Sequence, residues 1–137
     1  MDCLQSALNT NIVSQRNIIK NTVRKIDQLQ KEAAIQNSCE GCESSLFSTL
    51  YNTKPVTFYL CSGTAFAATI PTDTTVTTTV FRIEDFRDDG VILRLLTTED
   101  GATVCTNYTA ILDLDCVCAM QCFPPICCDE CTRICGA

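Results

Sequence analysis

The side chains that could do chemistry in this sequence are its twelve cysteines, about 9% of 137 residues, a level typical of cysteine-dependent scaffolds. Thiols can bind zinc or copper, act as redox pairs, or form disulfides. Histidine is absent, which excludes Cys-His and Ser-His-Asp catalysis and mixed Cys/His zinc sites. The sequence also lacks a phosphate-binding glycine loop and a nucleophile elbow. We therefore predict that the protein is not an enzyme and has no catalytic residue, metal ligand or cofactor.

One pair of cysteines, Cys39 and Cys42, has the C-x-x-C spacing of redox dithiols and of half a zinc site. A redox pair needs a helix N-terminus after a strand, whereas this pair follows a predicted helix. A zinc site needs a second close pair, which Cys128 and Cys131 could supply. The adjacent Cys127 and Cys128 are poorly spaced for chelation. A cysteine-rich protein that binds zinc or copper therefore remains the alternative function.

Oxidative cross-linking is the chemistry that the positions of the cysteines favour. Seven cysteines fall within residues 116–135, and another lies at the opposite end of the chain. A domain of this length has enough core to need few disulfides of its own, so the excess thiols should bond neighbouring subunits. The candidates for bonds between subunits are Cys3, Cys127, Cys128, Cys131 and Cys135. The candidates for bonds within the subunit or between strands are Cys39, Cys42, Cys61, Cys105, Cys116, Cys118 and Cys122.

The strand-length run over residues 102–118 carries both carboxylates and thiols. Asp113 and Asp115 alternate with leucines, so both should project from a solvated outer face. Cys116 and Cys118 should share one face at about 6.5 to 7 Å, too far apart to bond to each other easily. Each should therefore find a partner on another strand or another chain.

The elements that position the cysteines form two parts of opposite charge, +2 over residues 1–36 and -8 over residues 37–137. The net charge of -6 disfavours a nucleic-acid partner. Apolar residues three, four or seven apart predict one amphipathic helix over about residues 12–36. This stripe comprises Leu4, Leu8, Ile12, Ile19, Val23, Ile26, Leu29 and Ala33. Its spacing is compatible with docking on its own domain or on a neighbouring subunit.

From Pro55 onward, strand-length runs of β-branched and aromatic residues alternate with turn residues, which predicts a mainly β fold, an antiparallel sandwich or barrel-like domain. The predicted organisation is an N-terminal helical segment (1–38), a Cys-containing linker (39–52), a β domain (53–122) and a Cys-rich tail (123–137). The β domain should stay folded when its thiols are reduced. Its predicted core residues are Phe58, Leu60, Phe66, Phe81, Ile83, Ile92, Leu93, Leu95 and Leu112.

The first thirty residues contain no long apolar run and no signal-peptide pattern, and no stretch approaches the roughly 18 apolar residues of a membrane span. We therefore expect synthesis in a cytosol and no membrane insertion. A reducing cytosol conflicts with twelve cysteines unless oxidation follows a change of compartment.

The stretch from Asn52 to Phe123 closely resembles a known family. Its segments NTKPVTFYL, VFRIEDFRDDGVILRLL and LDLDCVCAMQCF follow the order NT-x-P-F-x-x-Y, [IV]FRVE-x-x-DD-x-x-x-LR-x-L and VDLSCFCAIQCL. That order is found in the cysteine-rich spore coat and exosporium proteins of the CotY, CotZ and ExsY group. The C-x-x-C upstream of the sheet region, here Cys39 and Cys42, also recurs there. The familiar members do not share the tail ICCDECTRICGA, so this chain resembles a divergent member of the family.

The resemblance implies a structural protein that is made in the mother-cell cytoplasm, assembles with itself and with other coat or exosporium proteins around the spore, and becomes cross-linked by disulfides. Oxidation after deposition would resolve the conflict of compartments. We expect the basic helix to attract the acidic body of neighbouring copies, which would orient subunits before thiols oxidise. On this view, deletion of residues 1–36 abolishes assembly and leaves a folded β domain.

Overall fold

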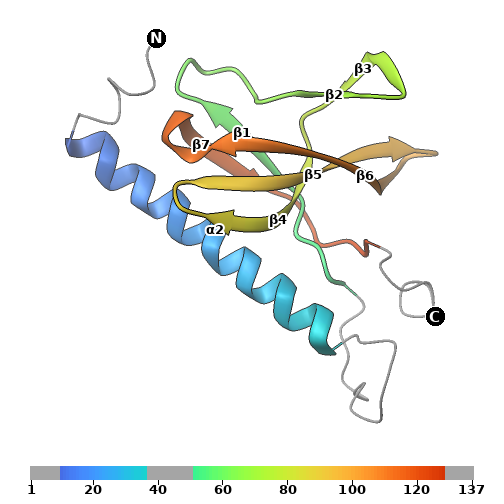
Figure 1. The fold of residues 1–137 in the computed structure, drawn as a ribbon, viewed down its shortest axis with the longest axis horizontal. Coiled ribbons are helices and arrows are strands. Elements are labelled where there is room, and N and C mark those ends of the chain that lie inside the picture. Colours follow the sequence, from blue (N-terminus) through green and yellow to red (C-terminus); the bar gives the residue numbers. More distant parts are fainter. Residues whose placement is uncertain (1–9, 37–50, 129–137) are drawn as a thin grey trace.

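The structure is a computed structural model that describes residues 10–36 and 51–128, with side chains from residues 18–33 and 51–128 (Figure 1). It confirms the mainly β, antiparallel class with one N-terminal helix. The elements are α2 (Thr10–Gln36), β1 (Val56–Leu60), β2 (Ala68–Ile70), β3 (Asp73–Thr78), β4 (Phe81–Arg87), β5 (Gly90–Glu99), β6 (Ala102–Asp113), the 3-10 helix η1 (Leu114–Cys116) and β7 (Val117–Cys122).

Five strands form one antiparallel sheet in the order β6-β5-β4-β1-β7, and β2 pairs with β3 in a separate hairpin. The two edge strands, β6 and β7, are consecutive in the chain and are joined only by η1. In a flat sheet these edges would lie about 19 Å apart, at four spacings of about 4.8 Å. The chain from residue 113 to residue 117 reaches at most about 14 Å. The sheet must therefore curl, which favours the barrel-like form over two facing sheets.

The helix packs on its own domain, where β4 separates from β1. These two strands pair only at Val56 and Phe81, and α2 contacts both β4 and β7. The Gln30 Nε2 atom donates a 2.6 Å hydrogen bond to the carbonyl of Ile83 in β4. Figure 1 shows α2 lying along one side of the curled sheet. The helix thus closes the opening that the diverging strands leave.

The apolar stripe of α2 enters a single hydrophobic core. Val23 is fully buried, whereas Leu29 is 49% exposed and Gln30 occupies the buried position beside it. The predicted stripe is wrong at Leu29, because the side chain that reaches β4 there is a hydrogen-bonding amide. The core cluster comprises Ile19, Val23, Ile26, Val56, Phe58, Ile70, Phe81, Ile83, Val91, Leu93, Leu95, Leu112, Leu114 and Val117.

Most of the predicted β core residues lie in this cluster or pack against it, among them Leu60 and Phe66 at its margin. Ile92 does not, because it points to the opposite face of β5 from Leu93. The cluster contains no cysteine. Three of its members come from α2, so the β strands alone do not complete the core. The packing therefore argues against the expectation that removal of residues 1–36 leaves a folded domain, which stays a prediction to be tested.

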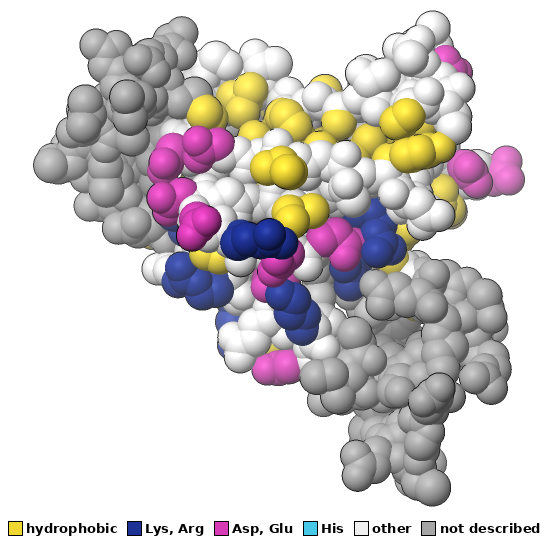
Figure 2. All heavy atoms as spheres, viewed as in Figure 1, with side chains coloured by type: hydrophobic (Ala, Val, Ile, Leu, Met, Phe, Trp, Pro, Cys, Tyr) yellow, Lys and Arg dark blue, Asp and Glu magenta, His cyan; other side chains and the backbone are white. Residues whose placement is uncertain are grey.

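The opposite charges of the helix and the body also meet within one chain. Lys31 lies 2.9 Å from Asp27 and 3.0 Å from Asp85, and these hydrogen bonds raise the pKa of Lys31 above its ordinary value. Lys20 pairs in the same way with Asp89 and Asp115. In Figure 2, Lys and Arg side chains gather among Asp and Glu side chains. Two basic side chains of the helix, Lys20 and Lys31, thus pair with acidic residues of their own subunit, and attraction between copies stays a prediction.

Within residues 10–36 and 51–128, no helix is both long enough and apolar enough to cross a membrane.

Candidate functional site: the disulfide framework

Seven of the cysteines lie in the described part of the chain, and six of them are disulfide-bonded. The bond between Cys61 and Cys118 joins the residue after β1 to the edge strand β7, with Cα atoms 4.8 Å apart. The backbone also holds this corner, because Cys61 N–H donates a 3.0 Å hydrogen bond to the carbonyl of Cys116. The pairing of β1 and β7 shifts register beside Leu60, which places Cys118 next to Cys61.

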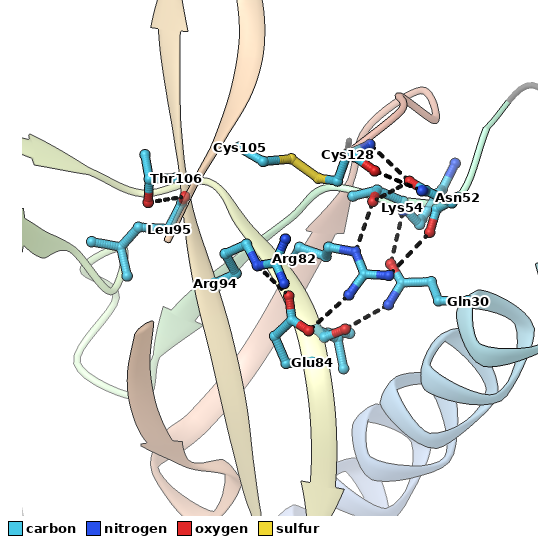
Figure 3. The surroundings of a disulfide bond; sticks show 12 residues. Gln30, Asn52, Lys54, Arg82, Glu84, Arg94, Leu95, Cys105, Thr106 and Cys128 are labelled. Carbon is cyan, nitrogen blue, oxygen red and sulfur yellow. Dashed lines mark hydrogen bonds and ion pairs between the residues drawn. A yellow bond between two sulfur atoms is a disulfide. The ribbon is translucent and has the colours of Figure 1, made fainter. Parts of the chain in front are cut away.

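The second bond, between Cys105 and Cys128, joins β6 to the segment that follows the two prolines (Figure 3). The Cα atoms lie 5.6 Å apart, and Cys128 is fully buried. The sequence placed Cys128 among the candidates for bonds between subunits, on the view that the whole tail is mobile. The structure differs because backbone contacts hold residues 126–128 against the body.

Those contacts come from Asn52 and Thr53, just before β1. Thr53 and Ile126 form an isolated antiparallel bridge, with N–H to O=C distances of 3.1 and 2.9 Å. The side-chain amide of Asn52 donates to the carbonyl of Cys128 at 2.7 Å and accepts from its N–H at 2.8 Å. Figure 3 shows both bonds beside the disulfide. The tail is thus docked by hydrogen bonds as well as by sulfur.

A buried arginine supports Asn52 and Thr53 from the sheet. Arg82 of β4, 5% exposed, donates through Nε to Thr53 Oγ1 at 2.8 Å and through Nη2 to the carbonyl of Asn52 at 3.4 Å. Its charge is balanced by Glu84, whose carboxylate lies 2.9 Å from Arg82 and 2.6 Å from Arg94. A buried charge needs such a partner and these hydrogen bonds to remain in place.

Sequence reasoning missed these supporting residues. Asn, Thr and Arg have no spacing that marks them as neighbours of a cysteine 76 residues away. The available signal was the NT-x-P pattern and the FR pair in the quoted family motif, which contain Asn52, Thr53 and Arg82.

Cys116 and Cys127 are also disulfide-bonded. Cys116 lies in η1 rather than on the predicted strand, so it does not share a strand face with Cys118. The free thiol in the described residues is Cys122, at the exposed end of β7, although the sequence grouped it with the internal bonds. Cys3, Cys39, Cys42, Cys131 and Cys135 lie outside the described residues, so their pairing stays a prediction.

The two aspartates near η1 have structural partners. Asp113 Oδ1 accepts a 2.9 Å hydrogen bond from the backbone N–H of Asp115 and caps η1. Asp115 lies 2.8 Å from Lys20. The expected shared strand face is wrong, because the chain turns into the 3-10 helix here. In the part of the chain that the structure describes, no three Cys, Asp or Glu residues converge as metal ligands would.

The chain was compared with curated proteins and with solved structures, and neither comparison gives a match. A family model described as spore coat protein Z matches residues 7–110. The matched stretch includes α2 and the strands from β1 through most of β6, whereas the cysteine element at 115–122 lies beyond it. Since the match spans well over half of the chain, the protein belongs to the spore coat protein Z family.

Proposed function

We propose that this protein is a non-enzymatic structural component of the bacterial spore surface, which assembles with itself into a layer and is cross-linked by disulfides. It is made in the mother-cell cytoplasm and deposited in the coat or exosporium, where other coat proteins are its further partners. The observation that carries this proposal is its membership of the spore coat protein Z family.

The disulfide framework supports a role that depends on covalent robustness. The body of the subunit is stapled at two distant places, Cys61 to Cys118 and Cys105 to Cys128. Bonds of this kind limit the unfolded ensemble and resist detergent and heat. They leave the exposed Cys122 as a thiol that a neighbouring subunit could reach.

The position of Cys122 supports cross-linking between subunits. It lies on β7, an edge strand of the sheet, and β7 carries no charged side chain. Uncharged edge strands are surfaces where a second chain can pair, so a thiol on such an edge is brought near another molecule without chain rearrangement. Cys3, Cys131 and Cys135 are the further candidates for bonds between subunits.

The test compares assembly and cross-linking directly. The purified chain is oxidised with glutathione disulfide, run on a non-reducing gel and imaged by electron microscopy. We expect ordered oligomers, and bands of high mass in detergent that collapse with reductant. In the Cys122→Ser variant the high-mass bands should decrease while order persists, and Ser62→Ala serves as an exposed control beside the Cys61 disulfide.

Two results would contradict the proposal. A species that stays monomeric under oxidising conditions at all concentrations would show that the chain does not assemble alone. A monomer that carries one equivalent of zinc per chain after purification would instead favour the cysteine-rich metal-binding alternative.

A further inference from the structure

Asn52 is a buried polar residue, 8% exposed. Both the nitrogen and the oxygen of its side-chain amide form hydrogen bonds with the backbone of Cys128. Its Nδ2 donates to the carbonyl of Cys128 at 2.7 Å, and its Oδ1 accepts from the N–H of Cys128 at 2.8 Å. The amide thus replaces the peptide group of a partner strand. We propose that Asn52 is a positioning residue that selects Cys128, rather than its neighbour Cys127, as the disulfide partner of Cys105.

The selection follows from the register of the tail. Backbone pairing of the tail with Thr53 stops at Ile126, two residues before Cys128. In an extended chain successive side chains point to opposite sides, so a slip of one residue would turn Cys127 toward Cys105 and Cys128 away. The two hydrogen bonds of Asn52 extend the pairing to Cys128 itself. They fix which of the two adjacent thiols faces Cys105.

This clamp uses no sulfur atom, so it can form while every thiol is reduced. Thr53 Oγ1 donates to Asn52 Oδ1 at 2.9 Å, and Arg82 donates to both residues from the sheet below. Glu84 in turn holds Arg82 at 2.9 Å. The tail can therefore dock before its thiols are oxidised.

The choice of partner matters because Cys127 and Cys128 both form disulfides in the folded chain. Cys127 is itself disulfide-bonded, so a Cys105 to Cys127 bond would remove two correct bonds at once. The correct bond forms by two exchanges with glutathione disulfide. A cysteine thiolate attacks it and releases one glutathione thiolate, and the second cysteine thiolate then attacks the protein sulfur of the mixed disulfide and releases the other. Two thiols and one glutathione disulfide thus become one protein disulfide and two glutathione thiols.

The experiment refolds the reduced full chain at low concentration in glutathione redox buffers, so it does not depend on assembly. Samples are quenched with acid and digested with pepsin. Electron-transfer fragmentation identifies which of the adjacent cysteines is linked to Cys105. The variants are Asn52→Ala and, as a matched control, Asn107→Ala, an exposed asparagine on β6 two residues from Cys105.

In Asn52→Ala we expect the effective concentration of Cys105 and Cys128 to fall on the order of tenfold, as two hydrogen bonds are lost, and Cys105 to Cys127 linkage to rise. The Cys61 to Cys118 bond, which does not contact Asn52, should form as in the parent chain. Asn52→Asp should give an intermediate result, because it keeps the acceptor for the Cys128 N–H and loses the donor to its carbonyl. Asn107→Ala should match the parent.

Two outcomes would overturn the proposal. Unchanged pairing of Cys105 in Asn52→Ala would mean that the rest of the fold sets the register. A parallel loss of both the Cys105 to Cys128 and the Cys61 to Cys118 bonds would mean that Asn52 only stabilises the domain. A second background, Cys128→Ser, separates these cases further, since there Asn52→Ala must increase a Cys105 to Cys127 bond that the intact clamp suppresses.

Discussion

Lys20 Nζ lies 2.8 Å from Asp115 Oδ1, so a lysine of α2 is paired with a carboxylate of η1 that is 95 residues away in the chain. Asp89 lies 3.0 Å from the same amine. Burial by itself lowers the pKa of Lys20, but its hydrogen bonds to Asp115 and Asp89 outweigh burial and hold that pKa above its ordinary value. The pair fastens the helix at the point where the sheet turns from β6 to β7.

The Lys20→Met variant keeps the aliphatic stem and removes this charge. We expect its free energy of unfolding, measured in urea, to fall by about 1 kcal/mol, because the pair is partly exposed and screened by solvent. Lys25→Met, on an exposed position of the same helix, is the control and should change stability little. Equal values for the two variants would show that the ion pair does not secure the helix.

The burial of Val23 predicts that the helix is part of the folding unit. Val23→Ala should lower the free energy of unfolding by about 2 kcal/mol, because it leaves a cavity in the core. Ile18→Ala, at a 66% exposed position of α2, should lie within about 0.5 kcal/mol of the parent. Deletion of residues 1–36 should give an aggregating or partly folded chain. A soluble, cooperatively melting deletion variant would contradict the packing described above.

The absence of cysteine from the hydrophobic cluster predicts a fold that tolerates reduction. Reduction breaks the Cys61 to Cys118 bond, which closes a loop of 57 residues and contributes about 4 kcal/mol at most, together with the other disulfides, but it leaves the hydrophobic cluster intact. The β signal in far-ultraviolet circular dichroism should therefore persist in reductant at about 20 °C, and the melting temperature should be lower than in the oxidised protein. A random-coil spectrum in reductant would show that the disulfides, and not the core, hold the domain.

The exposed thiol of Cys122 predicts selective labelling. Treatment of the oxidised monomer with a maleimide should modify Cys122, whereas the bonded Cys61, Cys105, Cys118 and Cys128 should react only after reduction. Peptide mass spectrometry measures both states, and Cys122→Ser provides the control. Labelling of Cys61 or Cys118 without reductant would mean that their bond does not form in solution.

Hydrogen bonds from Lys31 and Arg87 lower the pKa of Asp85 below its ordinary value. A lowered folded-state pKa means that Asp85 stabilises the fold above its unfolded pKa of about 3.9, and that this contribution is lost as pH falls through the folded-state pKa. We therefore expect Asp85→Asn to be less stable than the parent at about pH 7. The two proteins should be equally stable at about pH 2, because Asp85 is then protonated. Urea titrations at several pH values measure the difference. Glu99→Gln, at the exposed end of β5, is the control variant.

Local patterns in the sequence were enough to predict the class of the fold. The 3.6-residue spacing of Ile19, Val23 and Ile26 marks a helix face, and alternation with turn residues marks the strands, because both signals depend only on neighbours in the chain. The same patterns predicted most of the core, since a residue that alternates inward on a strand is buried whatever the strand packs on. The cysteine-rich composition and the family motif predicted a cross-linked spore protein for the same reason: they can be read without coordinates.

Pairings between distant residues were decided only by the tertiary structure. Cys128 bonds to Cys105 because Asn52, Thr53 and Arg82 meet from separate elements and fix the tail, and no spacing in the sequence encodes that meeting. The helix docks on its own sheet because β4 leaves β1 after a single pair, which opens a place for Val23 in the core. Strand register and curl arise from the sum of many long-range contacts, so they set which thiols meet inside the subunit and which, like Cys122, remain at its edge.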